Sequence, residues 1–197
     1  MSIQILLSSG NIKIPKTTAI FNMSSAANCP SRKRGLCKAI VNGKNRCYAF
    51  KAERLYPTCK PYREKQELFW KSSSAKSFVQ YFLALNTLNN NKFDTLRFSE
   101  AGDFHTQKCV DKAEKIATLL KQYNIKTYTY TSRNDLNFSN IKNLIINGSG
   151  FTKDGISGIF KMISKTEAIP NGFKLCPMDC KICKRCLNGK NTVVRQH

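Results

Sequence analysis

Apolar residues in the middle of the chain recur with two different periods, which predicts a strand, a helix and a second strand. Between 108 and 123 they fall three or four positions apart and form one helical face; they are Val110, Ala113, Ile116, Ala117, Leu120 and Tyr123. The shorter runs 95–99 and 126–131 carry the β-branched and aromatic residues that favour strands. We therefore expect a βαβ unit with two parallel strands and a helix packed on one face of the sheet.

Similar patterns extend this alternation toward both ends of the chain. Short apolar runs predict further strands at 17–21, 143–147 and 192–195. Apolar residues at helical spacing predict helices at 46–56 and 64–88, with a loop at 88–92. Alternating strands and helices are typical of an α/β fold, and 197 residues suit one domain, of which 174–197 form a cysteine-rich C-terminal extension.

The loop after the 95–99 strand carries our candidates for catalysis. Ligands bind at the carboxyl ends of the strands in parallel sheets, so residues directly after such a strand face the functional edge. Glu100, Asp103 and His105 lie in this loop and could perform acid–base chemistry. The segment 131–135 follows the next strand and should share the edge. The alternative is structural, with Asp103 capping its turn or pairing with an arginine and His105 serving only as a loop residue.

A compact group of four cysteines near the C-terminus is the strongest chemical signal in the sequence. We call Cys176, Cys180, Cys183 and Cys186 the C-terminal cysteines. Two intervening residues separate the last three from one another, as in the cysteine run with which bacterial ferredoxins bind [4Fe–4S] clusters. The spacing favours iron–sulfur. Zinc in a four-cysteine site, and thiols without a metal, are the alternatives.

A second, looser group lies near the N-terminus. Cys29, Cys37 and Cys47 form this group, and Cys59 follows them. Three thiolates would leave one iron of a cluster open for a small molecule, whereas Cys59 as a fourth ligand would close it. The alternative is that these thiols bind no metal. Cys109 stands alone at the start of a predicted helix and is expected in the core.

Positive charge gathers in the same two segments as the cysteines. The chain has 33 Lys and Arg against 12 Asp and Glu, a formal net charge of +21. Residues 29–63 carry a net +9 and residues 174–197 a net +5, and together they hold eight of the nine cysteines. Lys and Arg stabilise nearby thiolates. A basic surface also attracts polyanions, so nucleic acid is a candidate partner.

The cysteine count and the lack of a long apolar run indicate where the protein works. Nine cysteines are an odd number, and a domain of this size does not need disulfides, so metal binding in a reducing compartment is favoured. No apolar run has the length of a membrane span, and the first residues lack the pattern of a signal peptide. We expect a cytoplasmic protein without membrane contact; the sequence indicates no oligomeric state.

Several short motifs resemble a known family. They are Ser24-Ser25-Ala26 before Cys29-Pro30, Cys47-Tyr48-Ala49, Leu96-Arg97-Phe98-Ser99 before Gly102-Asp103-Phe104, Tyr128-Thr129-Tyr130-Thr131-Ser132-Arg133, and the C-terminal cysteines. This succession resembles the gene product 88 domain of phages and bacteria, and that family in turn resembles radical S-adenosylmethionine (SAM) proteins. The resemblance covers nearly the whole chain.

The resemblance implies a radical-SAM-like partial (β/α) barrel, a viral source and therefore the host-cell cytoplasm. It also implies an iron–sulfur site in the cysteine-rich N-terminal loop, in addition to the C-terminal cluster-binding segment that the cysteine spacing favours. In radical SAM proteins an acidic, glycine-containing loop receives the amino group of the cofactor. Glu100, Gly102 and Asp103 occupy the comparable loop here, and Tyr48 beside Cys47 joins them as a candidate cofactor contact.

Two functions from different classes follow. The first is an iron–sulfur protein of phage-like origin, with one or two [4Fe–4S] clusters and SAM as a further cofactor, that performs radical or redox chemistry on nucleic acid or a small molecule. The second is a non-enzymatic module that binds nucleic acid, in which zinc or iron–sulfur sites only hold basic loops in place. Cys29, Cys37 and Cys47 are spaced more widely than the usual Cys-x₃-Cys-x₂-Cys signature of radical SAM proteins, which keeps the second function open.

Overall fold

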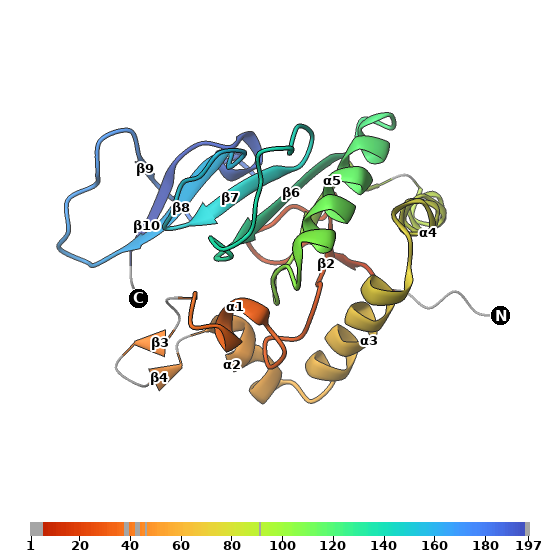
Figure 1. Cartoon of the computed structure of the whole chain (residues 1–197), viewed down its shortest axis with the longest axis horizontal. Helices are drawn as coiled ribbons and strands as arrows, with labels where there is room; N and C mark the ends of the chain where they lie inside the picture. Colours follow the sequence, from red (N-terminus) through yellow and green to blue (C-terminus); the bar gives the residue numbers. More distant parts are fainter. Residues whose placement is uncertain (1–5, 38–39, 42–43, 46, 91, 196–197) are drawn as a thin grey trace.

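The computed structural model describes residues 6–37, 40–41, 44–45, 47–90 and 92–195 (Figure 1). Its strands are β1 (Ser8–Ser9), β2 (Thr18–Phe21), β3 (Ile40–Val41), β4 (Lys44–Asn45), β5 (Thr95–Phe98), β6 (Lys126–Thr131), β7 (Ile145–Ser149), β8 (Gly158–Ile163), β9 (Lys174–Leu175) and β10 (Thr192–Arg195). Within the described ranges, eight of these form one sheet in the order β1-β2-β5-β6-β7-β8-β10-β9. All neighbours in this sheet run parallel except β1 and β2, and β3 pairs with β4 separately.

The helices are α1 (Pro30–Lys33), α2 (Tyr48–Leu55), α3 (Cys59–Ser72), α4 (Ala75–Leu88) and α5 (Gln107–Lys121), with a short 3-10 turn, η1, at Cys186–Asn188. Apolar side chains of α3, α4 and α5 form the main core together with strands β2 and β5. Aromatic rings dominate this core; those at most 1% exposed are Phe21, Trp70, Phe78, Phe82, Phe98, Phe104 and Phe138. Figure 1 shows α5 packed over the sheet beside β6. The helices α1 and α2 lie below the sheet, near the chain that leaves β2.

The predicted α/β class and the central βαβ unit are confirmed. Strands β5 and β6 are parallel neighbours, and α5 connects them with its apolar face buried, as its periodicity predicts. Tyr123, which the periodicity assigns to the same face, instead lies beyond the end of α5 and is exposed. The barrel is not closed, because β1 and β9 are the two edges of an open sheet in the described part of the chain. The two-residue strands β1, β3, β4 and β9 were not predicted from the sequence, and neither was the six-residue strand β8.

The stretch predicted as one helix at 64–88 is two helices. Ser74 interrupts it, because its side chain accepts a hydrogen bond from the backbone N–H of Ser77 and so begins α4 with an N-cap. Of the other predicted boundaries, Arg46 and Asn91 lie outside the described residues, as does the second histidine, His197.

Side chains alternate across the strands, which gives the sheet two different faces. Leu96 and Phe98 point into the helical core, and Arg97 between them points to the opposite side. We call this opposite side the site face. Strand register places Tyr128 of β6 beside Arg97, and Asn147 of β7 beside Tyr130 of β6. The Tyr130 ring contacts both Arg97 and Phe160 of β8, so all five residues lie on the site face.

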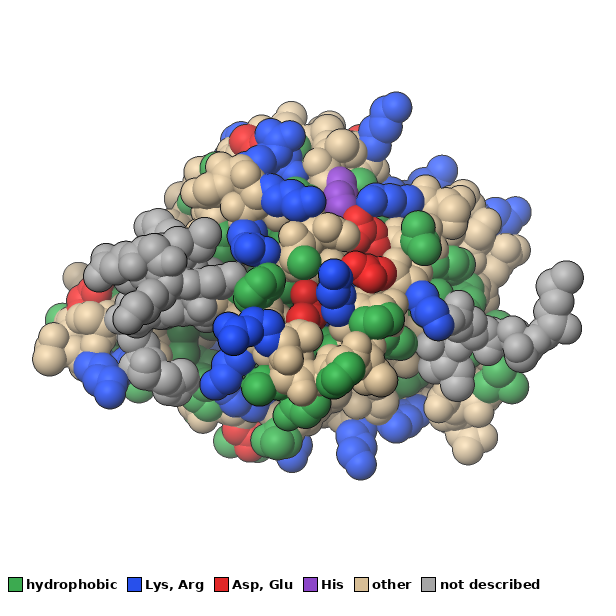
Figure 2. All heavy atoms as spheres, turned by 90° about the horizontal axis from the view of Figure 1, so that it is seen from below, with side chains coloured by type: hydrophobic (Ala, Val, Ile, Leu, Met, Phe, Trp, Pro, Cys, Tyr) green, Lys and Arg blue, Asp and Glu red, His purple; other side chains and the backbone are tan. Residues whose placement is uncertain are grey.

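Many of the acidic side chains are engaged by basic neighbours inside the protein. Glu53 pairs with Arg63, Glu67 with Lys71, and Asp135 with Arg133. Figure 2 shows one face of the molecule, where Lys and Arg side chains surround a small group of acidic side chains beside the histidine. The positive excess therefore lies at the surface. No helix in the described ranges is long and apolar enough to cross a membrane.

Candidate cofactor pocket and cysteine sites

A cavity of about 160 Å³ opens where β2, β5, β6 and β7 end. Its lining comes from the segments that follow these strands, so the carboxyl edge of the parallel sheet forms the candidate site, as predicted. This volume exceeds by far the space that one water molecule needs. The cavity can therefore hold a ligand larger than water.

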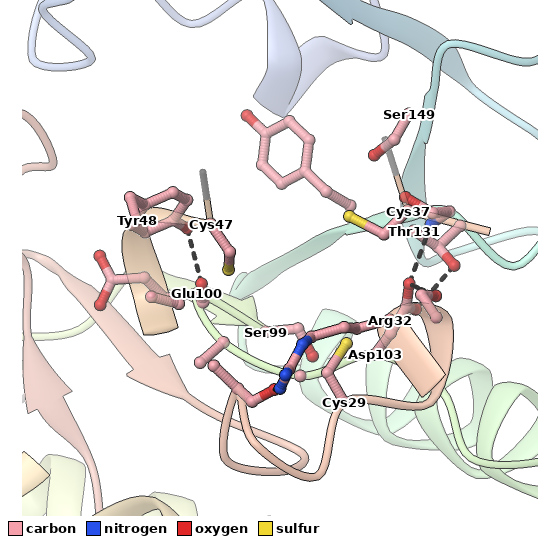
Figure 3. Close-up of a pocket in the computed structure, with 17 residues that line it drawn as sticks. Cys29, Arg32, Cys37, Cys47, Tyr48, Ser99, Glu100, Asp103, Thr131 and Ser149 are labelled. Carbon is pink, nitrogen blue, oxygen red and sulfur yellow. Dashed lines mark hydrogen bonds between the residues drawn. The ribbon is translucent and has the colours of Figure 1, made fainter. Parts of the chain in front are cut away.

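Cys29, Cys37 and Cys47 all line this cavity, and we call them the pocket cysteines. Cys29 precedes α1, Cys47 precedes α2, and Cys37 lies between these two helices. Figure 3 shows their side chains pointing into the cavity from different directions. Cys59, at the start of α3, is not among the lining residues, and Cys109 packs against the main core. Folding thus brings together three thiols that are widely spaced in the sequence.

Burial dominates the acidity of the Cys29 thiol. It raises the pKa of the Cys29 thiol to about 12, and the nearby Asp103 carboxylate adds to the rise. Burial also raises the pKa of Cys180 and of Cys186. Across the described residues, no three His, Cys, Asp or Glu side chains are grouped so that they could hold a metal ion as they stand. Metal binding here would have to displace thiol protons and draw the side chains together.

Asp103 joins the segments that carry the site. One of its oxygens accepts hydrogen bonds from the backbone N–H of Phe104 (2.8 Å) and the hydroxyl of Thr131 (2.7 Å). The other accepts from the hydroxyl of Ser31 (2.5 Å) and the backbone N–H of Ser132 (2.9 Å). Burial raises the pKa of this carboxyl group, against the effect of the four hydrogen bonds. Asp103 therefore positions the pocket, and its acceptor sites face other residues of the protein.

Glu100 and Tyr48 lie together at the mouth of the cavity (Figure 3). The Tyr48 hydroxyl donates to the backbone carbonyl of Glu100 at 2.6 Å, which fixes α2 against the loop after β5. The Glu100 carboxylate accepts a 2.7 Å hydrogen bond from the side-chain amide of Asn11. This carboxylate remains half-exposed, and Figure 3 shows it turned away from the three thiols, so it could meet a ligand only at the mouth of the cavity.

Ser99 was not singled out from the sequence, yet its conformation and environment are unusual. Its φ is +57°, a left-handed conformation that non-glycine residues rarely adopt. The residue lines the cavity and is only 7% exposed, and its hydroxyl has no hydrogen-bond partner. A buried hydroxyl without a partner is costly, so a polar ligand atom in the cavity would relieve this cost.

Gly102 is required by packing against the loop after β2. A Cβ at this position would lie 2.3 Å from Oγ of Ser24 and 2.7 Å from the backbone of the same residue, and φ is +79°. We expect Gly102→Ala to lower the free energy of unfolding by about 3 kcal/mol. Gly172 is the matched control, because it has the same φ but nothing within 4 Å of its Cβ. Gly172→Ala should cost only about 1 kcal/mol, and equal losses in urea unfolding would contradict the packing explanation.

His105 lies apart from the residues that line the cavity. One ring nitrogen, Nε2, is 3.2 Å from the backbone carbonyl of Met23 and 3.8 Å from a carboxylate oxygen of Glu67 on α3. Burial lowers the pKa of this imidazole, so the neutral form is favoured. Its role as an acid–base group of the pocket stays a prediction, and its neighbours favour a contact that ties the loop after β5 to α3.

The C-terminal cysteines lie in the connection between the parallel strands β9 and β10. Cys180 is close enough to the other three thiols to interact with each of them electrostatically. The backbone N–H of Met178 donates to the Cys176 sulfur at 3.4 Å, and Met178 itself has a left-handed φ of +62°. A strained turn with an N–H directed at a thiol sulfur suits a thiolate ligand.

A family model described as Gene product 88 matches residues 5–150, about three quarters of the chain. The chain belongs to the gene product 88 family. This match confirms the family that the motifs resemble, and it is consistent with a phage-like gene product. No curated protein and no solved structure matches the chain. Within this gene product 88 chain, the family match contains the pocket cysteines and the loop after β5, whereas the C-terminal cysteines lie beyond it.

Proposed function

We propose that this gene product 88 protein is an iron–sulfur protein on a radical-SAM-like partial barrel. The observation that carries the proposal is the meeting of three thiols from separate loops in one cavity at the carboxyl edge of a parallel sheet. The donor set fits, because cysteine thiolates are the usual ligands of iron–sulfur clusters. The pocket cysteines would hold a first cluster.

When bound there, a [4Fe–4S] cluster supplies a low-potential electron and, at the iron without a cysteine, a coordination position for a small molecule. The protein's own groups would orient that molecule. Ser99 offers a buried hydroxyl without a partner, and Glu100 offers a carboxylate at the mouth of the cavity. The carboxylate would accept hydrogen bonds from the amino group of SAM, while Asp103 keeps the surrounding segments in place.

The C-terminal cysteines would hold a second cluster with all four thiols. Their mutual proximity and the N–H directed at the Cys176 sulfur support a thiolate site. Zinc in the same site is the alternative, and metal analysis separates the two because only iron–sulfur protein contains acid-labile sulfide. This second site has no open ligand position and so would serve structure or electron transfer.

The experiment that tests the enzymatic proposal uses full-length protein purified without oxygen, with its iron and sulfide content confirmed. Addition of SAM and a one-electron reductant should yield 5′-deoxyadenosine and methionine. Glu100→Gln should raise the SAM concentration for half-maximal turnover about tenfold, because a charge-assisted hydrogen bond is lost. Glu64→Gln on α3, whose carboxylate pairs with Lys60 at the surface, is the control and should change nothing. Cluster-loaded protein that forms no 5′-deoxyadenosine would contradict the enzymatic proposal.

Binding of nucleic acid without catalysis is the second candidate, favoured by the exposed lysines around the C-terminal cysteines. Lys174, Lys181, Lys184 and Lys190 are all exposed there. We expect affinity for DNA or RNA to fall by about a thousandfold between about 50 and about 200 mM salt. The double variant Lys181→Gln and Lys184→Gln should weaken binding more than Lys115→Gln with Lys121→Gln on α5. Absence of binding at low salt would exclude this partner.

A further inference from the structure

Arg97 brings a positive charge into the space between the two cysteine sites. It lies on the site face of β5, its guanidinium lies 5.2 Å from the centre of the Tyr130 ring, and it hydrogen-bonds to Tyr128. Its Nε is buried and has no hydrogen-bond partner. No Asp or Glu in the described part of the chain forms a salt bridge with it.

A largely enclosed guanidinium without a carboxylate partner is costly, because burial removes the water that solvates its charge. Among acidic side chains, Glu100 interacts electrostatically with the guanidinium but forms no salt bridge with it in the described part of the chain. The Cys180 thiol is a second electrostatic neighbour of Arg97. A thiolate centre at the C-terminal cysteines would supply the negative charge that this guanidinium lacks.

Tyr130 connects the same site to the cavity. Its side chain hydrogen-bonds to the sulfur of Cys186, and its ring packs on Phe160 with 5.3 Å between ring centres. Tyr130 also lines the cavity that contains the pocket cysteines. The side-chain amide of Asn147, next to Tyr130 in the sheet, donates to the backbone carbonyl of Cys186 at 3.0 Å. The sheet thus holds Cys186 through a side-chain and a backbone contact.

We propose that Arg97 and Tyr130 are positioning residues of the C-terminal thiolate centre, Arg97 as its buried counter-charge and Tyr130 as the hydrogen-bond donor to Cys186. This inference rests on the proposed iron–sulfur function. Four thiolates and a [4Fe–4S]²⁺ core carry a net charge of about −2, and one-electron reduction adds one more negative charge. A neighbouring cation and an O–H···S hydrogen bond stabilise the reduced form more than the oxidised form, so both raise the reduction potential.

The test isolates the C-terminal cluster by replacing the three pocket cysteines with alanine in the full-length chain. In this parent protein, the midpoint potential is measured by redox titration with paramagnetic resonance detection, with dithionite as the electron donor. Arg97→Gln and Tyr130→Phe should each shift the potential to a more negative value at unchanged iron and sulfide content. Arg97→Lys keeps the charge and should restore most of the shift seen in Arg97→Gln.

Two variants serve as matched controls. Lys126→Gln removes an exposed charge at the start of β6, and Tyr123→Phe removes the hydroxyl of an exposed tyrosine, so neither should move the potential. Loaded Tyr130→Phe or Arg97→Gln protein with the potential of the parent would overturn the inference while leaving the iron–sulfur proposal intact. Parent protein without iron and sulfide would instead overturn the iron–sulfur proposal at this site, and the inference with it. Tyr130→Phe removes only one hydroxyl, so it keeps the test decisive if Arg97→Gln fails to fold.

Discussion

Asp103→Asn is expected to lower the free energy of unfolding by about 4 kcal/mol. The carboxylate accepts four hydrogen bonds, two of them from the backbone N–H groups of Phe104 and Ser132. An asparagine amide keeps one acceptor oxygen, and its NH₂ group would face at least one N–H that cannot reverse its direction. The buried donors left without a partner account for the expected loss.

Urea unfolding followed by circular dichroism measures this loss, provided that the slope with denaturant stays constant. Asp111→Asn on α5 is the matched control, because that exposed carboxylate accepts a hydrogen bond from the Gln107 side chain, and its loss should cost less than about 0.5 kcal/mol. Asp103→Asn should also weaken metal retention in the pocket, since Asp103 holds Ser31 of α1 close to the sheet edge. Equal stability of the two variants would contradict the positioning role.

Replacement of the pocket cysteines by alanine is expected to halve the metal content of anaerobically reconstituted protein. With one cluster at each cysteine site, iron should fall from about eight to about four atoms per chain. Cys109→Ala is the control, since that thiol packs against the core outside both sites and should leave iron unchanged. Cys59→Ala tests whether Cys59 is a fourth ligand of the cluster in the cavity, a question that the sequence leaves open. Loss of iron in this variant would identify Cys59 as a ligand, whereas unchanged iron would show that it binds no metal there. Unchanged iron after loss of the pocket cysteines would contradict a cluster in the cavity.

The sequence predicted those features whose residues lie close together along the chain. The apolar stripe of α5 and the alternation in β6 are local patterns, and both elements have the predicted form. The break at Ser74 was missed because a serine within an otherwise apolar helical pattern is ambiguous until its side chain is seen to cap α4. The closure of the sheet depends on how edge strands meet, which local periodicity does not specify.

The candidate site was predicted in outline for the same reason. A loop after a parallel strand lies at the carboxyl edge, so the region of Glu100 and Asp103 could be placed. The role of Asp103 depends on partners 72 and 28 positions away, Ser31 and Thr131, and no local pattern reveals them. The left-handed Ser99 and the enclosed Arg97 emerge only from the folded chain, because backbone dihedrals and burial decide their importance.

The most direct test of the account is the iron, zinc and acid-labile sulfide content of the full-length, unsubstituted protein purified without oxygen. Two [4Fe–4S] clusters should give a brown protein with about eight iron and about eight sulfide per chain. A colourless protein that contains zinc, with neither iron nor sulfide, would contradict it.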